Sequence, residues 1–116
     1  MINNERHNRA LEIAEKRIKN SKVMEYVKEL YLYGSLARGD VRWGSDIDLL
    51  LVLDNKGKEI RELKKEIIYL KGNLTEDDLD APEVDLKVVF GDEWKKSSQL
   101  YYKNVRKEGI KLWSSH

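Results

Sequence analysis

The feature that most constrains this chain is an unbroken run of five aliphatic residues, Leu-Leu-Leu-Val-Leu, at positions 49–53. A run of this kind predicts a strand over residues 47–53 that is buried on both of its faces. Such a strand needs a neighbour on each side. Segments 28–33 and 84–90 also have the character of strands and are the natural neighbours. The sequence therefore predicts a sheet in which 47–53 is an inner strand.

The remaining segments predict helices around this sheet. Apolar residues recur at helical spacing in three stretches, and Gly, Asn and Asp clusters separate them. Asn4 and Asp92 are the expected N-caps of the first and last helices. The predicted elements are helices over 4–20, 58–70 and 93–108, a helical turn over 36–39, a turn at 54–57, an acidic loop over 72–83, and an edge strand over 110–113. The expected fold is α/β (α+β), a small mixed sheet of three to four strands with packed helices.

Composition limits the class of protein. With 116 residues, 41% of them apolar, we expect one domain over residues 1–116 with one core. The net charge of +1 argues against strong nucleic-acid binding by bulk electrostatics. The absence of cysteine excludes disulfides and thiolate zinc sites. No apolar stretch approaches the length of a membrane span and the first residues are polar, so we expect a cytoplasmic protein without a membrane association.

Three acidic residues mark a candidate site. Asp46 and Asp48 are two residues apart at the start of the aliphatic strand, so their side chains share one face. Asp85 lies within another predicted strand, where a charge is costly unless it is paired or binds a metal. If the strands are neighbours, each pair of carboxylates repels by about 3 kcal/mol at a separation of about 5 Å. Oxygen ligands alone favour Mg²⁺ or Mn²⁺ as the relieving ion.

A glycine–serine pair lies at the end of the neighbouring strand. Gly34 would let a phosphate approach the backbone, and the Ser35 hydroxyl would add a donor. A phosphate-binding turn that faces an acidic cluster is the arrangement for phosphoryl or nucleotidyl transfer. Alternatively, acids at the start of a strand can serve as caps or turn formers. Trp43 could stack on a nucleobase or pack in its loop, and His7 has no partner within the sequence.

The full motif is similar to that of a known family. Gly34-Ser35, ten intervening residues and Asp46-Ile47-Asp48 resemble the signature of the DNA polymerase β-like nucleotidyltransferase superfamily. The short length of the chain and the sequence of residues 34–39, Gly-Ser-Leu-Ala-Arg-Gly, look most like the minimal nucleotidyltransferase (MNT) branch. The resemblance covers residues 27–113, including the closing Glu-Gly-Ile-Lys-Leu-Trp at 108–113. Many members have arginine where this chain has Leu36.

The resemblance implies a role for each site residue. The acids would be catalytic and would bind two Mg²⁺ (or Mn²⁺) ions, with ATP as substrate. The nucleotide-binding set would be Gly34 and Ser35 on the triphosphate, together with Arg38 and Ser45. Arg38 would act either by phosphate contact or by supporting the loop. The expected metal-binding and catalytic residues are Asp46, Asp48 and Asp85.

The resemblance also implies a reaction and a partner. Members of this branch commonly pair with HEPN-domain toxins, so the expected activity is transfer of AMP, or another NMP, to a hydroxyl such as a tyrosine of the toxin. With no room for an added acceptor domain, the acceptor site would be shallow, shared with another protomer in a homo-oligomer, or supplied by a partner. Two alternatives stay open: an antitoxin that neutralises its toxin by binding alone, and a small-molecule adenylyltransferase that modifies an antibiotic.

Overall fold

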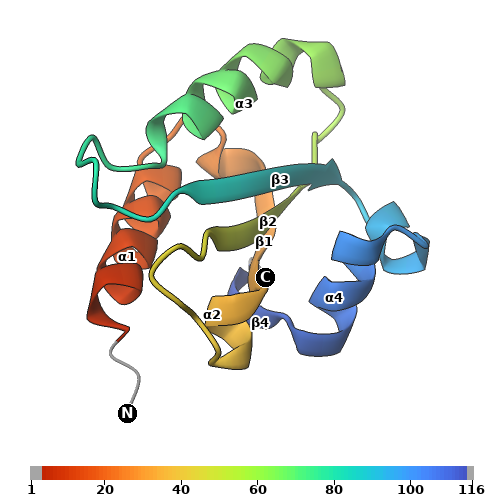
Figure 1. Ribbon diagram of the computed structural model, residues 1–116. Helices are drawn as coiled ribbons and strands as arrows, with labels where there is room; N and C mark the ends of the chain where they lie inside the picture. Colours follow the sequence, from red (N-terminus) through yellow and green to blue (C-terminus); the bar gives the residue numbers. More distant parts are fainter. Residues whose placement is uncertain (1–3, 115–116) are drawn as a thin grey trace.

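A computed structural model of the protein describes residues 4–114 and shows one mixed sheet with helices packed on it (Figure 1). The strand order is β3-β2-β1-β4, with β1 antiparallel to β2 and β4, and β2 parallel to β3. The expected fold class is confirmed. The elements in chain order are α1 (Glu5–Lys19), η1 (Met24–Tyr26), β1 (Val27–Tyr33), α2 (Ser35–Arg38), β2 (Ile47–Leu53), α3 (Ile60–Asn73), β3 (Val84–Phe90), η2 (Glu93–Lys96), α4 (Leu100–Glu108) and β4 (Ile110–Ser114).

Strand β2 is the centre of the core, as its aliphatic run predicted. Alternate side chains point to opposite faces of the sheet, and all of residues 49–53 are fully buried. On one face Leu49, Leu51 and Leu53 pack in a cluster with apolar residues of α1 and α3. On the other face Leu50 and Val52 pack with Trp94 of η2 and Val105 of α4. Helices therefore cover both faces of the inner strand.

The directions of the strands bring three chain segments to one end of the sheet. Tyr33, the last residue of β1, pairs with Asp48 at the start of β2 because these strands are antiparallel. Asp48 pairs in turn with Asp85 at the start of β3 because those strands are parallel. A parallel pair requires a crossover connection, which here contains α3. This end of the sheet thus holds the end of β1 beside the starts of β2 and β3.

The prediction of one continuous helix over residues 93–108 is wrong. Residues 93–108 form two pieces, η2 and α4, with Ser97 and Gln99 in extended conformations between them. The Ser97 hydroxyl accepts a hydrogen bond from the Gln99 N–H at 3.2 Å, a local turn that competes with the helix. Arg106 donates to the carbonyl oxygens of Trp94 and Ser97 at 2.7 and 2.8 Å and holds the bend. The bend allows both Trp94 and Val105 to face the core.

Smaller differences concern helix ends. Asn4 and Asp92 occupy the predicted N-cap positions, but neither makes a side-chain capping bond. Asp92 instead pairs with Lys28 and Lys95 at 3.1 and 3.4 Å. Helix α3 begins at Ile60, two residues after the predicted start at 58, and the Ile60 side chain is about half exposed. Within residues 4–114, no helix is long and apolar enough to span a membrane.

Two leucines of very different exposure test this account of the core. Leu51→Ala should lower the free energy of unfolding by about 2–5 kcal/mol, because a fully buried side chain leaves a cavity between two packed layers. Leu79→Ala, at a fully exposed loop position, should change it by less than about 0.5 kcal/mol. Urea unfolding of both variants measures the difference. Similar losses in the two would contradict the central position of β2.

Candidate active site

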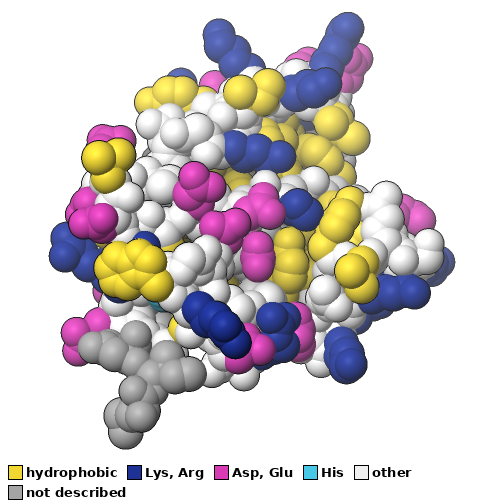
Figure 2. All heavy atoms as spheres, viewed as in Figure 1, with side chains coloured by type: hydrophobic (Ala, Val, Ile, Leu, Met, Phe, Trp, Pro, Cys, Tyr) yellow, Lys and Arg dark blue, Asp and Glu magenta, His cyan; other side chains and the backbone are white. Residues whose placement is uncertain are grey.

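Three acidic side chains face one pocket at the end of the sheet where β1, β2 and β3 meet. Asp48 and Asp85 are register partners on adjacent strands, and Asp46 lies two residues before Asp48. In the space-filling view, acidic side chains gather near the middle of this face with basic ones around them (Figure 2). The pocket has a volume of about 370 Å³, and its lining residues are Tyr33, Gly34, Ser35, Arg38, Ser45, Asp46, Asp48, Asp85, Lys87, Tyr101 and Asn104. All seven predicted site residues therefore line one pocket.

Gly34 permits the closest contact in the site. It has a φ of +79° and a ψ of −158°, a region open essentially to glycine alone. A Cβ atom placed on Gly34 would overlap the Asp48 carboxylate oxygen Oδ2. Ser35 then begins α2, whose short turn closes through hydrogen bonds from Arg38 N–H to the Gly34 carbonyl and from Gly39 N–H to that of Ser35, both at 3.0 Å. The turn thus passes directly against the acidic cluster.

Burial and the neighbouring acids both affect the Asp48 carboxyl. Its half-buried position raises the pKa of the Asp48 carboxyl to about 6, and the negative charges of Asp85 and Asp46 contribute to the rise. Burial together with Asp48 and Asp85 also raises the pKa of Tyr33 above its usual value. The three carboxylates consequently repel one another, and only nearby basic side chains offset this repulsion.

Lys87 supplies part of that offset. It is two residues from Asp85 on the same strand face, and its ammonium lies 3.3 Å from Asp85 Oδ2 and 4.9 Å from the centre of the Tyr101 ring. Among residues 4–114, no three acidic or histidine side chains already converge as a metal-binding group. The donor set itself, three carboxylates and no nitrogen or sulfur, has the chemistry that Mg²⁺ or Mn²⁺ requires. Ion binding would need Lys87 to release Asp85.

Arg38 and Ser45 reach the pocket but are engaged in local contacts. Arg38 pairs with Asp40 at 3.2 Å and with Glu108 of α4 at 2.9 Å. The Ser45 hydroxyl accepts a hydrogen bond from the Arg42 N–H at 2.9 Å and closes the loop before Asp46. Both residues therefore shape the backbone around the acids.

Helix α1 buttresses the same loop, a role that sequence reasoning missed. His7 is buried, and its Nε2 lies 2.9 Å from the Ser45 carbonyl oxygen. The neighbouring Arg6 guanidinium lies 3.7 Å from the centre of the Trp43 ring and donates to the Trp43 carbonyl. Nothing local in the sequence indicates contacts across 38 residues. Trp43 consequently packs within its loop on Arg6, while its ring stays largely exposed.

Helix α4 adds side chains that sequence reasoning also missed. Tyr101 and Asn104 line the pocket, and Glu108 contacts the turn at Gly34. Their spacing of three and four residues places them on one side of the helix, a signal that was available in the sequence. Lys87 could likewise have been found from strand alternation, two residues beyond Asp85.

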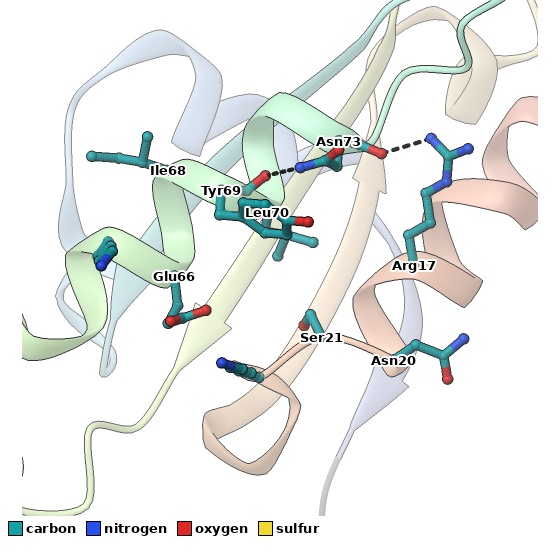
Figure 3. A pocket seen from close by; sticks show the side chains of 10 residues that line it. Arg17, Asn20, Ser21, Glu66, Ile68, Tyr69, Leu70 and Asn73 are labelled. Atoms are coloured by element: carbon teal, nitrogen blue, oxygen red, sulfur yellow. Dashed lines mark hydrogen bonds between the residues drawn. The ribbon is translucent and has the colours of Figure 1, made fainter.

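A larger pocket lies elsewhere and does not contain this chemistry. It occupies about 850 Å³ between the end of α1 and α3 (Figure 3), and Glu66 is the one acidic residue among its described lining. Arg17 borders it but donates to the carbonyl oxygens of Asn73 and Thr75 at 2.6 and 3.2 Å. Clustered carboxylates, rather than volume, identify the pocket beside β2 as the candidate active site.

Comparison with known families agrees with this geometry. The family described as "Nucleotidyltransferase domain" matches residues 8–112, nearly the whole chain. The chain belongs to this nucleotidyltransferase family. A comparison of this chain with curated proteins found no match.

Solved structures show the same fold at low sequence identity. A protein of Sulfolobus solfataricus described as a nucleotidyltransferase is 23% identical, with a TM-score of 0.58 over 95% of this chain and 85% of that one. A mutant form of the toxin–antitoxin MntA–HpeT is 19% identical, with a TM-score of 0.56 over 94% and 73%. Spectinomycin adenyltransferase AAD(9) of Enterococcus faecialis, solved with ATP and spectinomycin, is 13% identical, with a TM-score of 0.57 over 99% and 57%.

Substitution at Gly34 tests the contact between the turn and Asp48 in this nucleotidyltransferase. Gly34→Ala should lower the free energy of unfolding by about 2 kcal/mol or more, because it adds an overlap to an unfavourable φ. Gly57→Ala is the matched control, since Gly57 also has a positive φ but nothing lies within 4 Å of an added Cβ. It should cost about 1 kcal/mol. Equal losses of unfolding free energy in the two variants would show that the Asp48 side chain moves aside at no cost, which would contradict a fixed contact.

The pKa of Asp48 predicts a pH dependence of stability. In the folded state it is about 6, above the ordinary value of 3.8, so the folded protein binds the proton more tightly. Stability from this group is therefore complete below pH 3.8 and is lost as pH rises through about 6. The loss should be on the order of 1 kcal/mol after discounting for solvent screening of a half-exposed group.

Asp48→Asn isolates this effect, because the amide keeps the shape and removes the charge. In chelator at pH 7.5 the variant should unfold at the same temperature as the wild type or higher, and its stability should lack the decline between pH 4 and 6. Thermal melts across this range measure it. A variant clearly less stable at pH 7.5 would instead assign Asp48 a structural role as a cap or salt-bridge partner.

Proposed function

We propose that this nucleotidyltransferase transfers a nucleoside monophosphate, AMP in the first instance, from a triphosphate to an acceptor hydroxyl. The observation that carries the proposal is the convergence of Asp46, Asp48 and Asp85 on one pocket beside the Gly34–Ser35 turn. A polar turn against an acidic cluster suits a metal–triphosphate complex better than a neutral ligand. Gly34 and Ser35 would contact the triphosphate, with Ser45 and Arg38 shaping the site around it.

The acidic residues would hold two divalent ions, Mg²⁺ or Mn²⁺. When bound, such ions supply charge neutralisation for the triphosphate and lower the pKa of the attacking hydroxyl. Burial and, after it, the negative charges of Asp85 and Asp46 raise the pKa of Asp48, and the repulsion among these charges is a reason for the cluster to favour cations. Lys87, now paired with Asp85, would exchange that partner for solvent or for a phosphate oxygen of the substrate.

The reaction follows from the positions of these groups. The acceptor oxygen would form a bond to the α-phosphorus as the bond to the leaving pyrophosphate breaks. Asp85 would sit beside the acceptor and take the hydroxyl proton. Its carboxylate is about half exposed, so an acceptor group can reach it from solvent.

The proposed acceptor is a tyrosine hydroxyl of a HEPN-domain toxin, with this chain as its antitoxin. The pocket is open to solvent, and its volume of about 370 Å³ is small for a whole nucleotide with its acceptor, which suits an acceptor presented by a partner. Similarity of fold to MntA–HpeT and to a toxin–antitoxin solved with AMP-PNP, at a TM-score of 0.50, supports this choice. The similarity to AAD(9) supports a small-molecule acceptor as the second candidate, although this chain spans 57% of that protein.

Intact-mass spectrometry tests the proposal directly. Incubated with Mg-ATP, this chain should increase the mass of its cognate HEPN toxin by one or more AMP units. Asp46→Asn should reduce the rate by about a hundredfold or more, since it removes a carboxylate from the cluster. Asp77→Asn, in the exposed acidic loop, is the matched control and should leave the rate unchanged.

Two other results would redirect the proposal. Neutralisation of the toxin without a mass change, and equally well by Asp46→Asn, would establish an antitoxin that acts by binding. Adenylylation of spectinomycin or a related aminoglycoside, with no modification of the toxin, would establish a small-molecule adenylyltransferase.

A further inference from the structure

Glu108, the last residue of α4, contacts the Gly34–Ser35 turn through one carboxylate oxygen. Its Oε1 accepts a hydrogen bond from the Gly34 N–H at 3.3 Å and another from Arg38 Nη1 at 2.9 Å. The Glu108 side chain is 18% exposed, so water only partly screens these contacts. One oxygen therefore joins the end of α4 to both the turn and helix α2.

The place of Glu108 in its own helix needs these contacts. A negative charge at a helix C-terminus opposes the helix dipole and lowers helix stability. Gly109 then closes α4 with a hydrogen bond from its N–H to the Val105 carbonyl oxygen at 2.8 Å, and a Cβ there would overlap that oxygen. The helix thus ends in a fixed geometry that presents Glu108 to the turn. Arg38 and the Gly34 amide are what offset its charge.

Arg38 would bind a phosphate in competition with its existing ion pairs. Two carboxylates, Asp40 and Glu108, already share its single positive charge. If Arg38 turned to a phosphate, Glu108 would be left as an uncompensated negative charge beside an anionic nucleotide. The gain from a direct phosphate contact by Arg38 would therefore be offset by repulsion between the Glu108 carboxylate and the phosphate.

We infer that Glu108 is a positioning residue that holds the Gly34–Ser35 turn, and that Arg38 serves as its counter-ion rather than as a phosphate ligand. The inference rests on the proposed function in assigning that turn to the triphosphate. Of the two roles that the sequence left open for Arg38, phosphate contact or support of the loop, the inference selects the second.

A double-mutant cycle on Mg-ATP affinity separates the two roles of Arg38. Arg38→Met should weaken binding by about tenfold, because it leaves the Glu108 charge unbalanced, and Glu108→Gln should weaken it by about threefold. With both changes the charge is gone, so the double variant should bind better than Arg38→Met, within about threefold of wild type. Losses that multiply to about thirtyfold would overturn the inference, because Arg38 would then act on the nucleotide by itself. If Arg38→Met does not fold, Arg38→Gln, which also removes the positive charge, takes its place in the cycle with the same expected losses.

Hydrogen exchange of the Gly34 amide tests the positioning role without nucleotide. In the nucleotide-free protein, Glu108→Ala should accelerate this exchange by about tenfold or more, because the amide loses its acceptor. Asp40→Asn is the matched control: Arg38 keeps Glu108, so exchange and Mg-ATP affinity should stay within about twofold. Unchanged Gly34 exchange in Glu108→Ala would overturn the inference. A wild-type protein that binds no Mg-ATP would defeat the proposed function, whereas the exchange result would still decide the role of Glu108.

Discussion

The burial of β2 on both of its faces is the constraint on which the rest of the structure depends. Because the side chains of residues 49–53 are buried on both faces of the sheet, the strand must lie between β1 and β3 and be covered by helices on each face. The polar start of the same strand is then held at the end of the sheet, where the core stops. Hydrophobic burial of residues 49–53 thereby fixes the position of Asp48 at the end of the sheet.

The site is an electrostatic compromise built on that rigid frame. Three carboxylates occupy one end of the sheet, and the positive charges of Lys87, on the same strand as Asp85, and of Arg38 on α2 offset part of their charge. Asp48 is more buried than Asp85, whose carboxylate is about half exposed and can be reached from solvent. Because of this difference in exposure, Asp48 is the acid with the raised pKa and Asp85 is the one that an incoming group can reach.

The sequence predicted local features well and long-range ones poorly. The three long strands and the convergence of the acids follow from alternation and from hydrophobic runs, which act over a few residues. The bend at Ser97 was missed because it depends on Arg106, nine residues further on. Partners such as His7 with Ser45, or Glu108 with Arg38, are 38 and 70 residues apart, and spacing within a segment carries no information about them.

The parallel pairing of β2 with β3 has a consequence for how the protein is made. Asp85 follows α3 in the chain and Glu108 follows it at the end of α4, so a ribosome has synthesised both β2 and α3 before either can meet its partner. Contacts that close such long loops form late in folding. A partly synthesised chain therefore holds two of the acids beside an unpaired hydrophobic strand but no complete pocket. Assembly of the pocket therefore waits until β3 has paired with β2 and α4 has packed on the sheet.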